Sequence, residues 1–148
     1  MNLAEKLTQP PNRDRVVADC VTLVDAEVKS KSGFSGIAVK GAYGVVTAVK
    51  PRFVSEVIDG LLDSWVEKLE PFYASWKTDP GGKTFAEYLT AHRGETAEAL
   101  LEVTDRKAKV SKNGAVRKMY EKMRPSAKKH VEEALPRLGK LVEKNAAA

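Results

Sequence analysis

FVSEVIDGLLDSWVEKL, residues 53–69, is the stretch that decides the fold of this chain. Its apolar side chains recur in steps of three and one residues, so they line one face of a helix with 3.6 residues per turn. This apolar face consists of Val54, Val57, Ile58, Leu61, Leu62, Trp65, Val66 and Leu69. An amphipathic helix of this length cannot by itself offset the entropy lost when its backbone is ordered. The stretch therefore predicts a central helix that other helices cover.

Two prolines and a glycine affect the ends and the stability of this central helix. Pro51 resists continuation of any preceding helix, and Pro71 either ends the central helix or begins the next one. Gly60 weakens the helix by about 1 kcal/mol relative to alanine. We take Gly60 as a sign that a neighbouring helix approaches closely.

Further segments on both sides carry the same helical periodicity. They are residues 13–30, 84–93, 95–104, 113–123 and 127–144. Thr84 and Glu87 have the spacing of a capping box, which predicts that a helix begins there. The polar, basic residues 105–112 read as a linker, and Arg124-Pro125-Ser126 reads as a turn.

The segment FSGIAVKGAYGVVTAVK, residues 34–50, is ambiguous. Alternating apolar residues from Ile37 to Val49 are typical of strands. We favour a helix, because the chain offers no partner strands and an isolated hairpin is only marginally stable. In that helix Gly36, Gly41 and Gly44 are expected to lie where another helix comes close.

Length and composition favour one domain. The chain has 148 residues, of which 43% are hydrophobic and 30% charged, as in ordinary globular proteins. We predict an all-α, single-domain bundle of about six to eight helices around the central amphipathic helix. Residues 1–11 are expected to form an N-terminal arm, residues 12–105 an acidic helical core, and residues 106–148 basic C-terminal helices.

The sequence gives little sign of export or membrane insertion. Cys20 is the single cysteine, which excludes an internal disulfide. The first residues lack an apolar run typical of a signal peptide, and the longest uncharged apolar run, residues 41–49, is about half of the roughly 20 residues that span a bilayer. We therefore expect a cytoplasmic protein without a transmembrane segment.

Charge is distributed unevenly along the chain. Residues 1–105 carry a net charge of −4 and residues 106–148 a net charge of +9, within an overall +5. Such a basic region suits nucleic acid, an acidic protein or the periphery of an anionic membrane. The alternative interpretation is that the cations form a solvated surface without a partner. The predicted polyanion-binding residues are Arg106, Lys107, Lys109, Lys112, Arg117, Lys118, Lys122, Arg124, Lys128 and Lys129. A non-enzymatic binding or adaptor protein is therefore the first hypothesis.

The alternative hypothesis is a carrier of a small apolar ligand. Trp65, Phe72, Tyr73 and Trp76 gather in one part of the sequence, and helical bundles often bind ligands between their helices. The pattern is more typical of a packed core than of a ligand pocket.

An enzyme is the weakest hypothesis, because no nucleophile, metal or cofactor motif is assembled in the sequence. His92 and His130 are the only histidines, and neither occurs in a metal-binding motif, so we predict no metal and no cofactor. Five carboxylates form one face of the central helix: Glu56, Asp59, Asp63, Glu67 and Glu70. That face is either solvated, part of an acid/base cleft, or a docking surface for the chain's own basic segment.

Four pieces of the sequence carry a resemblance to a known family. They are VADC at residues 17–20, KP at 50–51, LEPFY at 69–73 and KKHVEEALP at 128–136. Together they resemble a family of small bacterial proteins of unknown function, over most of the chain. The resemblance implies an all-helical, bacterial, cytoplasmic protein and supplies no catalytic residues.

Overall fold

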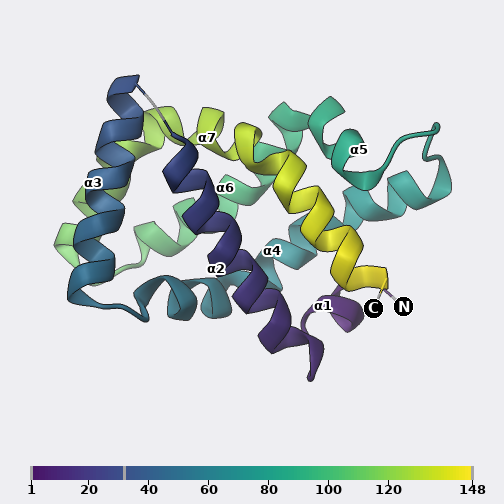
Figure 1. The fold of residues 1–148 in the computed structure, drawn as a ribbon, viewed down its shortest axis with the longest axis horizontal. Coiled ribbons are helices and arrows are strands. Elements are labelled where there is room, and N and C mark those ends of the chain that lie inside the picture. Colours follow the sequence, from purple (N-terminus) through teal and green to yellow (C-terminus); the bar gives the residue numbers. More distant parts are fainter. Residues whose placement is uncertain (1, 32, 148) are drawn as a thin grey trace.

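The structure is a computed structural model that describes residues 2–31 and 33–147, with the backbone alone for residues 33–35 and 38. The described residues form seven α-helices and no strand (Figure 1). The helices are α1 (Leu3–Leu7), α2 (Asn12–Ser30), α3 (Gly33–Val49), α4 (Phe53–Thr78), α5 (Phe85–Ala91), α6 (Arg93–Lys109) and α7 (Gly114–Ala147). The predicted all-α fold is confirmed, and the ambiguous segment forms the helix α3.

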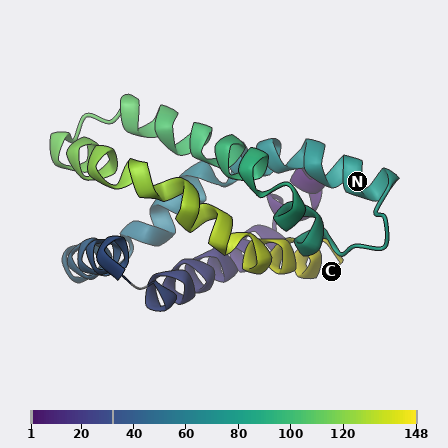
Figure 2. The same ribbon diagram turned by 90° about the horizontal axis from the view of Figure 1, so that it is seen from above.

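Two helices organise the bundle. The predicted central helix α4 packs against α1, α2, α3, α5 and α6, and α7 packs against the same five helices. In Figure 2, α7 starts beside α6 and runs across the molecule to the side of α2. This path brings α7 into contact with the same helices that α4 contacts. The core therefore depends on the long C-terminal helix as much as on α4.

The predicted apolar face of α4 is buried in the core. Ile58, Leu62, Val66 and Leu69 are almost fully buried, whereas Val57 is partly exposed. Apolar residues from the other helices complete the core, including Leu3, Leu7, Val16, Phe85, Leu89, Leu135 and Val142.

The N-terminal segment also belongs to this core. Leu3 and Leu7 of α1 are buried, and Asn2 and Glu5 form a capping box at the start of the helix. The backbone N–H of Leu3 donates a hydrogen bond to Glu70 of α4 at 2.8 Å. A short helix of this kind is stable only because its partners hold it, so α1 is a packed element of the bundle.

Several predicted helix boundaries are wrong. The helix α4 continues through Pro71, α7 continues through Pro125, and α6 extends to Lys109 through most of the predicted linker. The helix α7 also continues through Pro136, in agreement with the prediction of one helix over residues 127–144. Proline removes one backbone hydrogen bond and favours an end to the helix. All three prolines lie on exposed faces, and buried residues such as Leu69 and Tyr73 on either side of Pro71 keep the helix in place. Tertiary packing thus overrides the local preference.

The prediction of close approach at Gly60, Gly41 and Gly44 is also wrong. A methyl group added at any of these glycines would meet no atom within 4 Å. Of the glycines for which a close approach was predicted, Gly36 has one, since an added Cβ would lie 2.9 Å from the carbonyl carbon of Lys31. The other close contact is at Gly139 of α7, where an added Cβ would lie 2.3 Å from the Cα of Ala86. Gly139 therefore allows α5 to pack directly against α7.

The turn between α4 and α5 follows the sequence signals. Gly81 and Gly82 have positive φ angles of 59° and 76°, a conformation that glycine adopts without strain. Thr84 and Glu87 form the predicted capping box: the Glu87 N–H donates to the Thr84 hydroxyl, and the Thr84 N–H donates to the Glu87 carboxylate. The prediction that a helix begins here is confirmed.

Candidate anionic-surface interface and ligand cavities

The ten predicted polyanion-binding cations lie on two helices and the turn between them. Arg106, Lys107 and Lys109 belong to the last turns of α6, and Lys112 lies in the following turn. The remaining six are on the first part of α7: Arg117, Lys118, Lys122, Arg124, Lys128 and Lys129. Figure 2 shows α6 and the start of α7 side by side, so the fold brings these residues into one region.

Three of these cations are engaged by carboxylates of α6. Arg106 lies 3.1 Å from Glu102, Lys128 lies 3.2 Å from Glu98, and Arg124 lies 2.8 Å from Asp105. No ion pair involves the other seven among the residues that the structure describes: Lys107, Lys109, Lys112, Arg117, Lys118, Lys122 and Lys129. These seven can meet an external anion without first breaking an ion pair of the described structure, although Arg117 donates a hydrogen bond to the carbonyl of Ser111.

Asp105 joins α6 to α7. It accepts hydrogen bonds from the Tyr120 hydroxyl and the Arg124 guanidinium, and the Tyr120 oxygen also lies 2.9 Å from the Thr104 hydroxyl. The hydrogen bond from Arg124 lowers the pKa of Asp105. Burial, together with the bond to Asp105, raises the pKa of Tyr120 to about 12. The one aromatic residue of the basic region is therefore held inside the helix pair and is not free to stack on a base.

The helix α3 exposes aliphatic side chains. Ile37, Val45 and Val49 have exposed fractions of 70%, 62% and 76%. The turn after α6 adds Val110, with an exposed fraction of 69%, and α7 adds Met119. Sequence reasoning missed this surface, because a helix with one charged residue in 17 is expected to be buried.

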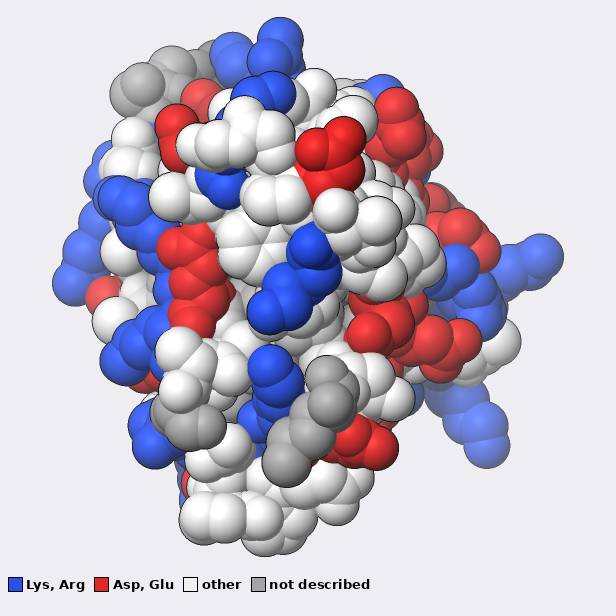
Figure 3. All heavy atoms as spheres, turned by 90° about the vertical axis from the view of Figure 1, so that its right-hand side faces the viewer, with Lys and Arg blue, Asp and Glu red and all other residues white. Residues whose placement is uncertain are grey.

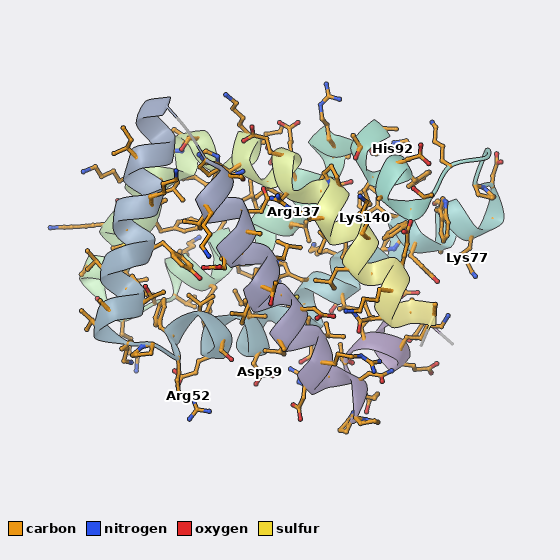
Figure 4. The ribbon with its side chains drawn as sticks, viewed as in Figure 1. Arg52, Asp59, Lys77, His92, Arg137 and Lys140 are labelled. Atoms are coloured by element: carbon orange, nitrogen blue, oxygen red, sulfur yellow. The ribbon has the colours of Figure 1, made fainter. Side chains whose placement is uncertain are left out.

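These aliphatic residues lie at the same end of the molecule as the basic turn. In both Figure 1 and Figure 2, α3 and the connection between α6 and α7 occupy the left-hand end. Residues 33–52 contain three cations and no acidic residue, and residues 106–123 contain seven cations and one acidic residue. Arg52, one of these cations, points away from the protein below α3 (Figure 4).

We call this region the cationic end. Its cations are Lys40, Lys50, Arg52, Lys107, Lys109, Lys112, Arg117, Lys118 and Lys122, and its exposed aliphatic residues are Ile37, Val45, Val49, Val110 and Met119. The opposite end differs, because acidic and basic side chains are interspersed there (Figure 3).

The acidic face of α4 meets the start of α2. Arg13 lies 3.0 Å from Asp59 and 3.1 Å from Asp63. Asp59 lies near the end of α2 that carries Arg13 (Figure 4). Among the described residues no ion pair joins Asp59 or Asp63 to the basic region, whereas Glu67 lines a surface hollow together with Arg106 and Lys107.

The four aromatic residues of the alternative hypothesis do not form one pocket. Tyr73 and Trp76 pack against Phe85, with ring centroids 5.3 Å and 5.5 Å from its ring, and Phe72 is partly buried beside the core. Trp65 lies elsewhere, and its indole N–H donates to the carbonyl of Leu100 at 3.3 Å. Tyr73 and Trp76 thus surround Phe85, and of the four aromatic residues only Trp65 lines the apolar cavity.

That cavity lies in the centre of the bundle and has a volume of about 230 Å³. Its walls come from α1, α2, α4, α6 and α7 and include Leu7, Cys20, Leu62, Trp65 and Leu141. The wall is apolar except for Thr104. No sequence signal marks this cavity, because its lining residues have the same pattern as the closed parts of the core.

Cys20 is an unreactive part of this wall. Burial, with a smaller effect of the charge on Asp19, raises the pKa of the Cys20 thiol to about 11. The thiol therefore stays protonated at neutral pH and is a poor nucleophile.

The described residues include no group of three or more side chains arranged to bind a metal ion. His92 packs against Tyr88, with ring centroids 4.5 Å apart. His130 lines a second, polar cavity between α2 and α7. Among the helices that the structure describes, none is both long and apolar enough to cross a bilayer.

A family model matches residues 3–146, which is nearly the whole chain. The chain belongs to DUF6918, a family of unknown function. This finding confirms the resemblance to a family of unknown function, and the structure shows that this DUF6918 chain is all-helical. No curated protein and no solved structure matches the chain significantly.

Proposed function

We propose that the protein is a non-enzymatic binding protein that docks its cationic end onto an anionic membrane surface. The observation that carries this proposal is the position of exposed aliphatic residues among the cations. Ile37, Val45, Val49 and Val110 are each more than 60% exposed, and residues 33–52 and 107–123 of the same end carry nine cations against a single acidic residue, Glu121. Aliphatic side chains surrounded by Lys and Arg are typical of helices that lie in a membrane interface.

A membrane surface can contact both the cations and the exposed aliphatic side chains, whereas the other anionic partners contact mainly the cations. Nucleic acid is bound through phosphate contacts and, in single strands, through stacking on aromatic rings. Tyr120, the aromatic residue of the α6–α7 part of the cationic end, is bound to Asp105 and is not free to stack on a base. Burial of the exposed aliphatic residues would contribute nothing at a phosphate backbone but would stabilise contact with the headgroup region.

The proposal assumes the bacterial, cytoplasmic setting that the sequence resemblance implies. The cytoplasmic leaflet carries anionic lipids and attracts basic segments with about 1 kcal/mol per Lys or Arg near the surface. Contact through an amphipathic face needs no transmembrane helix.

Cosedimentation with vesicles tests the proposal. The protein should sediment with vesicles of phosphatidylglycerol and phosphatidylcholine but not with phosphatidylcholine alone, and binding should weaken as NaCl is added. Replacing Lys112, Lys118 and Lys122 with Gln should weaken binding by about 3 kcal/mol, or about 100-fold.

A matched variant controls for total charge. Replacing Lys77, Lys83 and Lys140 with Gln removes the same charge outside the cationic end and should leave binding within a few-fold. If both triple variants lose binding equally, the cationic end is not the interface. Tight, salt-dependent binding to duplex DNA without vesicle binding would replace the membrane by nucleic acid, and capture of an acidic protein alone would replace it by that partner.

A second candidate function rests on the apolar cavity at Trp65. A volume of about 230 Å³ exceeds the roughly 150 Å³ that suffices for a benzene molecule, but it lies below the range of about 300–1,000 Å³ that drug-sized ligands occupy. The ligand of such a carrier would be a single-ring molecule or a short acyl chain.

Trp fluorescence tests the carrier hypothesis. Trp65 lines the cavity and Trp76 does not, so a Trp76→Phe variant reports on the cavity alone. Toluene or hexanoic acid should change its fluorescence saturably, and Cys20→Leu, which fills the cavity, should remove the response. A response that persists in Cys20→Leu would contradict binding in this cavity.

A further inference from the structure

A polar cavity of about 390 Å³ lies between the C-terminal end of α2 and the middle of α7. It is separate from the apolar cavity. The side chains that give it its character are Glu27, Lys31, Lys129, His130, Glu133 and Arg137. In Figure 4, Arg137 lies between α2 and α7 near the centre of the molecule.

The two carboxylates of this cavity are already paired. The buried Lys31 ammonium lies 3.0 Å from Glu27 and 3.4 Å from Glu133, and Arg137 forms an ion pair with Glu27. Buried charges are tolerated only when they are paired in this way. Partial burial of Glu133 opposes ionisation, but Lys31 and His130 lower the pKa of this carboxylate overall. Neither carboxylate is free to receive a further cation.

The cavity has more positive charges and hydrogen-bond donors than Glu27 and Glu133 can pair with. Three cations, Lys31, Lys129 and Arg137, face two carboxylates, and Lys129 forms no ion pair among the described residues. Both ring nitrogens of His130 are buried, and neither has a hydrogen-bond partner in the described part of the chain. The Nδ1 atom is 3.5 Å from a Glu133 oxygen, at the limit of a hydrogen bond. Buried polar groups without partners are uncommon, and each one calls for a bound water or ligand.

We infer that this cavity binds a small organic oxyanion, a carboxylate or a phosphate monoester. Arg137 presents N–H groups that its contact with Glu27 does not use, Lys129 supplies a second positive charge, and His130 supplies a ring N–H. A negative ligand would balance the surplus charge and give His130 its missing partner. The volume of about 390 Å³ is near the lower end of the usual range of about 300–1,000 Å³, so the ligand is a small metabolite.

The site is independent of membrane docking, because it requires neither α3 nor the turn between α6 and α7. The competing account is that ordered water alone fills the cavity. Each water occupies about 30 Å³ of liquid volume, so several would fit. A metal ion is excluded by the surplus of positive charge.

The two histidines of the chain provide a direct measurement. The ring C–H signals of His130 and His92 can be followed by NMR in the full-length protein, and a His92→Gln variant assigns them. Sodium phosphate and succinate should each be titrated at constant ionic strength against NaCl. We expect a saturable shift of the His130 signal with at least one of them and no shift of the His92 signal.

The two probes distinguish phosphate from carboxylate ligands. A further titration with glycerol 3-phosphate and with dihexanoyl phosphatidic acid distinguishes a free phosphate monoester from a lipid headgroup. A shift with the lipid alone would assign the site to a headgroup and overturn a soluble ligand.

Substitutions complete the test. Lys129→Gln and Arg137→Gln should each weaken binding by about tenfold, whereas Lys140→Gln, an exposed position one turn from Arg137, should not change it. Lys129 is exposed, so Lys129→Gln remains informative even if Arg137→Gln unfolds the protein. A His130 signal that moves with none of the probes, or moves equally with NaCl, would show that water alone fills the cavity.

Discussion

Gly139 sets the distance between α5 and α7. A Cβ atom at this position would lie 2.3 Å, 2.7 Å and 2.8 Å from the Cα, Cβ and N atoms of Ala86. Two of these are backbone atoms, which cannot move aside as the end of a long side chain can. The contact joins α5, a short helix of seven residues, to the longest helix of the bundle.

Gly139→Ala should therefore destabilise the protein by about 1–3 kcal/mol or more, because overpacking forces the two helices apart. Gly60→Ala is the matched control, since Gly60 also lies inside a helix but an added Cβ meets no atom within 4 Å. That variant should gain up to about 1 kcal/mol from helix propensity. Urea denaturation of both variants measures the difference, and a Gly139→Ala protein as stable as the wild type would show that α5 does not pack as described.

Individual residues were predictable from sequence where the signal is local. The capping box at Thr84 and Glu87 and the burial of Ile58 and Leu62 follow from spacing alone. The role of Gly139 does not, because it depends on Ala86, 53 positions earlier in the chain. For the same reason the sequence could not distinguish Gly139 from Gly60, where no neighbour approaches.

At the scale of elements, the α6–α7 pair is held by a cluster of polar side chains near its turn. Asp105 accepts hydrogen bonds from Tyr120 and Arg124, and Arg124 also approaches Glu98. The cluster lies beside the seven cations that have no ion pair in the described structure. It fixes the geometry in which Lys118 and Lys122 are presented.

Asp105→Asn should lower the free energy of unfolding by about 0.5–1 kcal/mol at pH 7, a modest value because both partners are partly exposed. The pKa of Asp105 is lowered in the folded state, so its contribution is present above the unfolded value of about 3.8 and is lost as the pH falls below it. Urea denaturation at pH 7 and pH 3 should therefore show a difference between wild type and variant that shrinks at pH 3.

The exposed Asp79 provides the control, since no ion pair of Asp79 occurs among the described residues. Asp79→Asn should leave the stability unchanged at both pH values. A difference between Asp105→Asn and wild type that persists undiminished at pH 3 would contradict the ionic origin of the effect.

The boundaries of elements were the least predictable part of the fold. Pro71 and Pro125 are strong local signals for an end, yet α4 and α7 continue through them. The cost of a proline inside a helix is about 3 kcal/mol, which a core helix recovers from the apolar side chains that remain buried on either side. Whether the helix continues through a proline depends on how much apolar surface its packing partners bury, and a single sequence does not reveal these partners.

For the whole molecule, the sequence predicted the basic region but not its surroundings. The charge asymmetry is visible in the order of residues, whereas the exposure of α3 is not, because a helix with four glycines and a single charged residue is normally buried. The sequence also did not reveal that Arg124 and Lys128 form ion pairs with acidic residues of α6. The predicted aromatic residues do not line one pocket, because Trp65 and Trp76 lie three turns apart on α4 and contact different residues, Leu100 and Phe85.

Exposed aliphatic residues at the cationic end lead to the last prediction. If α3 enters the headgroup region, Val45→Asp should weaken binding to phosphatidylglycerol vesicles by at least about tenfold, because burial of a valine contributes about 1.5 kcal/mol or more and a carboxylate is repelled. Val45 is 62% exposed, so the substitution should change stability by no more than about 0.5 kcal/mol.

Ala74→Asp adds the same charge at an exposed position of α4, near Lys77 and far from α3, and should leave vesicle binding unchanged. Vesicle cosedimentation and melting temperature should be measured on both variants. The lysine substitutions at Lys112, Lys118 and Lys122 test the electrostatic part of the interface, and Val45→Asp tests its apolar part. If the lysine variant loses binding while Val45→Asp retains it, the partner contacts charge alone, and a polyanion rather than a membrane interface becomes the better account of the cationic end.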